Sequence, residues 1–143
     1  MKEVFISKNV SETKKKAANF AERILNIESN GAIVIALEGE LGAGKTTFIQ
    51  GFVSGCGIKE KVKSPTFNIL KKYGERIYHL DCYRLKDEND LRAFDLKEIF
   101  NDSGNIVLIE WAERVSKILP GNHWKIHIDH ISENERKIEI SFN

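Results

Sequence analysis

Hydrophobic residues along this chain follow two periods, and the alternation between them predicts an α/β fold. Uninterrupted apolar runs occupy 32–38 and 106–109, a pattern typical of strands buried on both faces of a parallel sheet. Between residues 11 and 29 apolar side chains recur every three or four positions, which predicts a helix with one face packed inward. Strand and helix therefore alternate, as they do where parallel strands are joined by helices.

Residues with capping or turn chemistry mark the expected ends of the first elements. A short strand over 4–6 comes first. Asn9 and Ser11 are both suitable N-caps for the helix, and Asn9 is followed three residues later by Glu12, as in a capping box. Gly31 is expected to end the helix before the first buried strand.

The rest of the chain predicts strands that pair as hairpins at the edges of the sheet. Segments 67–73 and 76–83 flank Gly74-Glu75, and segments 124–131 and 136–142 flank a polar turn. The remaining expected elements are two short helical turns within 87–100 and a helix over 112–119 that stops at Pro120-Gly121.

The segment after the first buried strand carries the strongest chemical signal. Residues 39–46 read Gly-Glu-Leu-Gly-Ala-Gly-Lys-Thr and fit the phosphate-loop pattern GxxxxGK[ST], between a strand and a predicted helix over 45–55. Glycines let backbone N–H groups wrap a polyphosphate, and the start of a helix favours an anion. Lys45 adds a charge near the β- and γ-phosphates, and the Thr46 hydroxyl suits Mg²⁺. The loop therefore predicts a site for a nucleotide with magnesium.

Two carboxylates follow other predicted strands. Glu110 ends the second buried strand, where a P-loop fold places the carboxylate that anchors Mg²⁺, although an ordinary surface Glu after a core strand has the same pattern. Asp81 closes a less apolar strand. It is a candidate to orient or deprotonate the attacking water, or a structural acceptor of backbone N–H groups.

Further candidates each have a structural alternative. Thr66, after Pro65, is either a switch-like hydroxyl near the γ-phosphate or part of a simple turn. Trp111 is either a wall of the pocket or core filler. Arg84 and Arg136 are candidate phosphate or base contacts, or members of surface ion pairs.

Composition narrows the classes of function. The 143 residues suit one domain, and 22 basic against 21 acidic residues leave a net charge of +1, too small for long-range attraction to nucleic acid or membranes. No apolar run reaches the roughly 18 residues of a membrane span and no secretory start is visible, so we expect a cytoplasmic protein without membrane contact. Cys56 and Cys82 predict buried thiols without a disulfide or zinc site, and the four histidines lack metal-ligand spacing.

Four motifs in a fixed order resemble the signature of the TsaE (YjeE) family, bacterial ATPases required for the threonylcarbamoyladenosine modification of tRNA. The motifs are EGELGAGKTTF at 38–48, VKSPTF at 62–67, HLDCYRL at 79–85 and IEWAE at 109–113. Two departures, Ala112 where proline is common and Cys82 where leucine is common, affect no residue with a chemical role.

The resemblance implies a P-loop NTPase-like three-layer sandwich with a mixed, mainly parallel central sheet and antiparallel edge hairpins. It implies binding of ATP or ADP with Mg²⁺, and a weak ATPase that resets the partner proteins TsaB and TsaD, so that tRNA is met through them. Thr46 and Glu110 would ligate Mg²⁺, and Lys45, Asp81, Thr66 and Glu110 would serve hydrolysis. The residues expected to bind nucleotide are Val10, Thr13, Gly39, Gly42, Ala43, Gly44, Lys45, Thr46, Thr47, Trp111, Glu113 and Arg136.

Two other functions remain open at this point. A small-molecule kinase needs an acceptor pocket and usually an Arg-bearing lid, and no Arg-rich insertion follows Phe100. A module that senses nucleotide without hydrolysis has the same loop. A GTPase is disfavoured because no NKxD-like guanine motif occurs in the chain.

Overall fold

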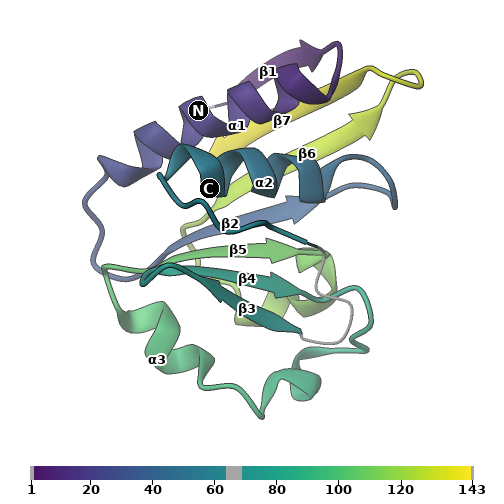
Figure 1. The fold of residues 1–143 in the computed structure, drawn as a ribbon. Coiled ribbons are helices and arrows are strands. Elements are labelled where there is room, and N and C mark those ends of the chain that lie inside the picture. The colour runs from purple at the N-terminus through teal and green to yellow at the C-terminus, as the bar shows by residue number, and fades with distance from the viewer. Residues whose placement is uncertain (1, 64–68, 143) are drawn as a thin grey trace.

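A single sheet forms the middle of the molecule in this computed structural model, which describes residues 2–63 and 69–142 (Figure 1). Its seven described strands are β1 (Lys2–Ser7), β2 (Ile33–Glu38), β3 (Leu70–Tyr73), β4 (Ile77–Asp81), β5 (Ile106–Glu110), β6 (Trp124–His130) and β7 (Arg136–Phe142). Their order across the sheet is β1-β7-β6-β2-β5-β4-β3.

The centre of the sheet is parallel and its edges are antiparallel, as the sequence predicts. Strand β2 pairs in parallel with β5 and β6, and β5 pairs in parallel with β4. Strands β3 and β4 form one antiparallel hairpin and β6 and β7 another, with β1 antiparallel to β7. Leu37 and Asp81 both pair with Glu110, so the carboxyl ends of β2, β4 and β5 meet at one edge of the sheet.

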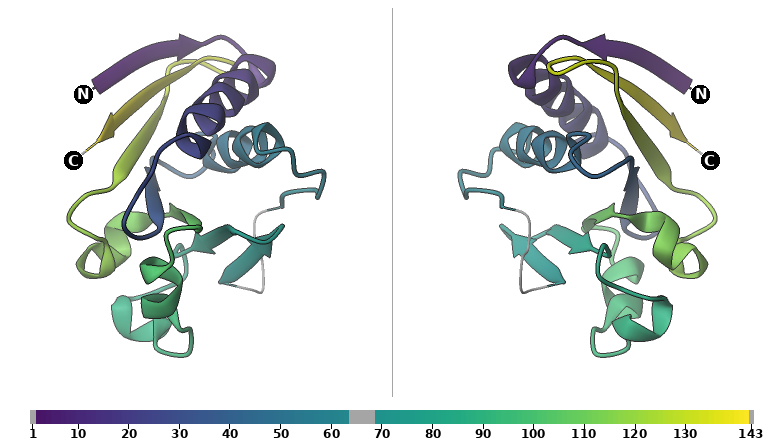
Figure 2. Two further views of the ribbon diagram at one scale, coloured as in Figure 1. Left: turned by 90° about the vertical axis from the view of Figure 1, so that its left-hand side faces the viewer. Right: turned by 90° about the vertical axis from the view of Figure 1, so that its right-hand side faces the viewer.

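Helices cover both faces of the sheet and give three layers (Figure 2). On one face lie α1 (Val10–Leu25) and α2 (Lys45–Gly55); η1 (Glu88–Leu91), α3 (Leu96–Asn101) and η2 (Ala112–Ile118) lie on the other. Alternation along β2 divides the core accordingly, because Ile35 and Leu37 pack with α1 and α2 whereas Val34 and Ala36 pack with the other layer.

Helices α1 and α2 lie side by side and approach closely through glycine (Figure 1). A Cβ at Gly51 would lie 2.5 Å from the Lys14 carbonyl oxygen, and one at Gly55 would lie 2.6 Å from the Ala18 Cα. Phe20 of α1 is buried in the core on this face of the sheet, where it is 1% exposed.

Two helices differ from the sequence-based expectation. Helix α1 ends at Leu25 instead of continuing to 29, because Asn26 caps it: its side-chain amide donates to the Glu22 carbonyl at 3.0 Å. The segment expected to be a helix over 112–119 is η2, two 3-10 turns interrupted at Val115, which is wholly buried with φ −131° and ψ 35°. Of the two candidate N-caps of α1, Asn9 is the one used, and it accepts from the Glu12 N–H at 2.9 Å.

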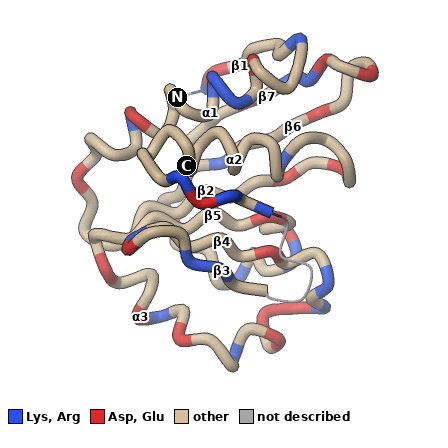
Figure 3. The backbone as a smooth tube through the Cα atoms, viewed as in Figure 1, with Lys and Arg blue, Asp and Glu red and all other residues tan. Residues whose placement is uncertain are grey.

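Other features of the described chain bear on function only weakly. Both cysteines are free thiols, and burial raises the pKa of Cys82 to about 12 and that of half-buried Cys56 to about 11. Lysine and arginine are interspersed with acidic residues along the backbone (Figure 3). Among the described residues, no helix has the length and apolarity that a membrane span requires.

Candidate functional site

The loop between β2 and α2 is shaped by glycines. Gly39, Gly42 and Gly44 have φ of 147°, 81° and 111°, backbone conformations that residues other than glycine rarely adopt. At Gly39 a Cβ would also lie 2.4 Å from the carbonyl oxygen of Ile128, so this residue lets β6 approach the loop. The loop leads directly into α2, whose first turn exposes unpaired N–H groups to a ligand.

Glu110 and Thr46 meet beside this loop. The Thr46 hydroxyl donates to Glu110 Oε1 at 3.3 Å, and the Glu110 side chain is 5% exposed. Strand alternation explains the placement, since Ile106 and Leu108 face the α1 and α2 layer and Glu110 follows with the same parity. The carboxylate therefore lies on the same side of the sheet as the phosphate loop.

The second oxygen of Glu110 is also engaged. Nε2 of His79 lies 2.6 Å from Glu110 Oε2, and the His79 side chain is wholly buried. The sequence indicated only that the histidines lack metal-ligand spacing, and it did not predict this contact of His79. One signal for it was in the sequence. His79 and Asp81 are two residues apart on β4, which pairs with β5, so their side chains face the same side of the sheet.

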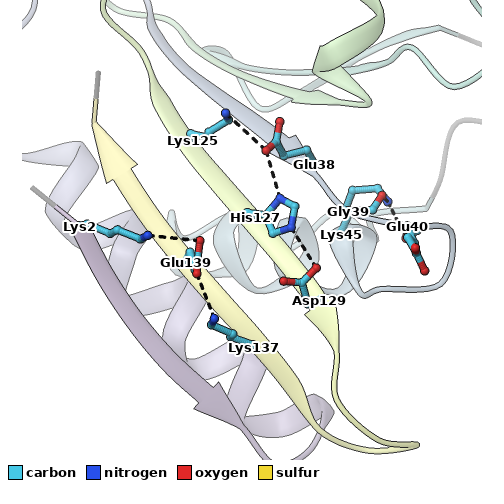
Figure 4. Close-up of polar contacts among 10 residues, drawn as sticks. All are labelled: Lys2, Glu38, Gly39, Glu40, Lys45, Lys125, His127, Asp129, Lys137 and Glu139. Atoms are coloured by element: carbon cyan, nitrogen blue, oxygen red, sulfur yellow. Dashed lines mark hydrogen bonds and ion pairs between the residues drawn. The ribbon is translucent and has the colours of Figure 1, made fainter.

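Lys45 lies folded against its own loop (Figure 4). Its Nζ donates to the carbonyl oxygens of Gly39 at 2.6 Å and Glu40 at 2.9 Å, and lies 4.2 Å from the centre of the Trp111 ring. Burial lowers the pKa of Lys45, and nearby carboxylates, Glu110 first, act in the opposite direction. The ammonium group is thus held inside the site.

Trp111 forms a wall of the site. It is the one non-glycine residue with positive φ among those described, at 58°. Its ring packs on Tyr83 with centroids 5.0 Å apart, and the guanidinium of Arg114 lies 5.5 Å from its centre. Between the two interpretations of Trp111, the position beside Lys45 favours the pocket wall.

A cavity of about 260 Å³ opens between the loop and the strand ends. Asp81 is in its lining, and its Oδ1 accepts from the Tyr83 N–H at 3.0 Å. The residues that line the cavity are Leu41, Gly42, Gly44, Lys45, Thr46, Thr47, Asp81, Tyr83, Glu110 and Trp111. Leu41 and Tyr83 were not among the predicted site residues.

A smaller cavity of about 70 Å³ adjoins the loop on its other side. It brings together two segments far apart in the chain, since it is lined by Asn9, Val10, Thr13, Gly44, Thr47, Glu133, Asn134 and Arg136. Arg136 Nε donates to the carbonyl oxygen of Ala43 at 2.9 Å and so ties β7 to the loop. Val10, Thr13 and Arg136, three of the residues expected to bind nucleotide, line this cavity together.

One predicted site residue is not described, and another lies outside both cavities. Thr66 falls outside the described residues, so its role stays a prediction. Glu113 is exposed and lines neither cavity, although its charge acts on Lys45.

A larger cavity of about 460 Å³ lies at the opposite end of the sheet, where its lining includes 27–34, Phe100 and His123. The lining includes the first residues of β2 and β6, Ile33 and Trp124, so the cavity lies at the amino ends of these two strands. Ligands of open α/β sheets bind at the carboxyl ends, so this cavity is a weaker candidate than the one beside Thr46.

The residues beside the loop fit a nucleotide with Mg²⁺. A carboxylate and a hydroxyl are oxygen ligands of the kind Mg²⁺ takes, usually one or two from the protein, with phosphates and water completing the set. Thr46 and Glu110 supply that pair. Among described residues, no cluster of three or more His, Cys, Asp or Glu suited to a metal is present.

Comparison with known proteins points to one family. The family model described as "Threonylcarbamoyl adenosine biosynthesis protein TsaE" matches residues 8–138. The tRNA threonylcarbamoyladenosine biosynthesis protein TsaE of Haemophilus influenzae is 40% identical over 124 residues, which cover 85% of this chain and 77% of that protein. The protein of the same name from Bacillus subtilis is 44% identical over 111 residues, or 76% of this chain and 68% of that protein.

The fold agrees with a solved structure. A crystal structure of Bacillus subtilis YdiB matches with a TM-score of 0.79 and 33% sequence identity, and the match covers 98% of this chain and 84% of that one. Residues 8–138, which the family model matches, span the loop, both buried strands and Glu110 at the end of β5. This chain therefore belongs to the TsaE family, whose members are named for threonylcarbamoyladenosine biosynthesis in tRNA.

Proposed function

We propose that this protein is a Mg²⁺-dependent ATPase that supports TsaB and TsaD as they make threonylcarbamoyladenosine in tRNA. The observation that carries the ATPase proposal is the contact between Glu110 and Thr46 at the start of α2. In P-loop NTPases such a carboxylate and loop hydroxyl hold Mg²⁺ against the nucleotide phosphates. The role in tRNA modification rests on family membership, and the two partners rest on the motif resemblance.

Each residue of the site has a binding or orienting task in this proposal. The N–H groups of residues 42–47 would bind the phosphates, and Lys45 would exchange the carbonyls of its own loop for phosphate oxygens. Thr46 and Glu110 would hold Mg²⁺, which neutralises negative charge on the phosphates when it is bound. Asp81, in the same cavity, would orient the attacking water.

Hydrolysis by the isolated protein is expected to be slow. P-loop enzymes gain much of their rate from an arginine that stabilises charge in the transition state. In the part of the chain that the structure describes, no arginine lines the cavity of about 260 Å³. A partner protein is therefore expected to complete the site or to accelerate it by reshaping the loop.

Phosphate release tests the proposal. Purified protein with ATP and Mg²⁺ should release phosphate slowly, faster with TsaB and TsaD, and not above background when Glu110 is replaced by Gln. Binding without release under all these conditions would favour a nucleotide-sensing module instead. Transfer of the γ-phosphate to a metabolite in a small-molecule screen would favour a kinase.

A further inference from the structure

His79 is buried beside the proposed magnesium ligand in an arrangement that a packing role does not explain. Its side chain is 0% exposed, and Nε2 lies 2.6 Å from Glu110 Oε2. Nδ1 is buried with no hydrogen-bond partner among the described residues. Leaving a buried polar atom unpaired is unfavourable, so an apolar side chain would serve packing better at this position.

Neighbouring residues fix the imidazole ring in place. It stacks on Tyr73 of β3, with centroids 6.2 Å apart and an interplanar angle of 29°. Because β4 and β5 are in register with Asp81 opposite Glu110, His79 lies diagonally across from Glu110 on the same face of the sheet. Nε2 therefore reaches the carboxylate from a rigid strand.

The two oxygens of Glu110 consequently have different partners. A carboxylate, when ionised, only accepts hydrogen bonds, so the His79 tautomer with its hydrogen on Nε2 is the one that can donate to Oε2. Oε1 accepts from the Thr46 hydroxyl. The carboxylate thus contacts His79 through one oxygen and Thr46 through the other.

We propose that His79 is a positioning residue, which holds Glu110 through Oε2 so that Oε1 faces Thr46 and the Mg²⁺ of the nucleotide. The inference rests on the proposed function, since it assigns His79 a task at that metal site. Partners that hydrogen-bond to metal ligands typically change metal affinity by about 10- to 100-fold when they are removed. His79 would therefore affect the affinity for Mg²⁺, whereas the affinity for ATP in the absence of the metal would not depend on His79.

Substitution at position 79 tests the assignment by a binding measurement. His79→Phe keeps an aromatic ring for Tyr73 but removes the donor, whereas His79→Gln keeps an N–H donor near the position of Nε2. ATP affinity is titrated calorimetrically in EDTA and over a series of Mg²⁺ concentrations. We expect His79→Phe to need about tenfold more Mg²⁺ for the same gain in ATP affinity, with affinity in EDTA unchanged and with His79→Gln closer to the wild type.

A matched control is His123→Phe, since His123 lies near the amino end of β6 and contacts the Pro120 carbonyl. Its Mg²⁺ dependence should equal that of the wild type. If His79→Phe also retains wild-type Mg²⁺ dependence, the positioning role is wrong. If the wild type itself gains no ATP affinity from Mg²⁺, the proposed function fails first, and the two failures are distinguishable.

A measurement on the intact protein covers the case in which His79→Phe does not fold. The ¹⁵N spectrum of His79 should show a hydrogen on Nε2, and the Nε2 signal should shift in Glu110→Gln. A hydrogen on Nδ1 alone would contradict the inference, because Nε2 could then not donate to Glu110.

Discussion

Thr46 and Glu110 are 64 residues apart in the chain, yet the Thr46 hydroxyl lies 3.3 Å from Glu110 Oε1. Two buried parallel strands bring them together, since β2 leads into the loop before Thr46 and β5 ends at Glu110 beside it. Both side chains are held by elements of regular structure, which keeps a site more rigid than loops alone do. The proposed chemistry depends on this pairing.

Replacing Lys45 by Met should weaken ATP binding without destabilising the free protein. A charge-assisted hydrogen bond contributes about 1.5–3 kcal/mol, which predicts a loss of roughly 10- to 100-fold in ATP affinity. Burial desolvates the Lys45 ammonium and lowers its pKa, so Met removes a buried charge together with its hydrogen bonds to the Gly39 and Glu40 carbonyls, and the melting temperature should change little. Calorimetry and thermal unfolding measure both effects. Lys97→Met, on the exposed surface of α3, is the control, and ATP affinity within twofold of the wild type for Lys45→Met would rule out its proposed phosphate contact.

Asp81→Asn should still bind Mg·ATP but should release little phosphate. Asn retains an acceptor for the Tyr83 N–H, so the local turn is preserved while the negative charge is lost. Asp102→Asn is a matched control, because Asp102 accepts from the N–H two residues later in the same way. Loss of nucleotide binding in Asp81→Asn would reassign Asp81 to a structural role.

Gly51→Ala should destabilise the fold. A methyl group at this position would lie 2.5 Å from the Lys14 carbonyl oxygen, so α1 and α2 would have to separate. Overpacking of this kind costs about 1–3 kcal/mol of unfolding free energy. Gly121→Ala is the comparison, since no atom lies within 4 Å of its added Cβ. Urea unfolding of both variants decides the question, and equal midpoints would show that the two helices have room to adjust.

His127 is expected to make stability depend on pH. Burial lowers its pKa, but hydrogen bonds to Glu38 and Asp129 act against this and leave the pKa above its ordinary value (Figure 4). The folded state therefore binds this proton more tightly than the unfolded state does. The stabilisation is complete below the ordinary pKa of about 6.5 and is lost as pH rises through the higher folded value.

Urea unfolding of the wild type and of His127→Gln between about pH 5.5 and pH 8.5 measures this contribution. The difference in unfolding free energy should shrink as pH rises. A difference that is constant, or that grows with pH, would contradict the raised pKa. The effect should be small, because the side chain is about one-third exposed and its ion pairs are screened.

Much of this fold was predictable because its signals are local. The apolar runs of β2 and β5 and the loop pattern are contiguous in the chain, so the central strands, α2 and the place of Glu110 followed from sequence. Helix α1 ends four residues before the predicted limit, because the end depends on one capping side chain, Asn26. Hydrophobic periodicity shows that a helix is present, but the residue at which the helix ends depends on its capping residue.

Contacts between distant segments were not predictable from spacing. His79 reaches Glu110 across 31 residues, and its parity on β4 becomes informative only once the register of β4 and β5 is known. The same holds for Arg136, which contacts the Ala43 carbonyl across 93 residues. The motif resemblance named the segments near Val10 and Arg136 without giving their geometry. The order of strands along the chain does not say which strands are neighbours in the sheet or in which register they pair. Such contacts can therefore be identified only once the fold is known.

Anomalous diffraction from crystals grown with Mn²⁺ and a non-hydrolysable ATP analogue tests the central claim most directly, because Mn²⁺ occupies magnesium sites and is located by its own signal. We expect one peak beside the β- and γ-phosphates, with the Thr46 hydroxyl as a ligand and Glu110 binding the metal directly or through one water. A peak distant from both side chains, with the triphosphate outside the loop of residues 39–46, would contradict the account.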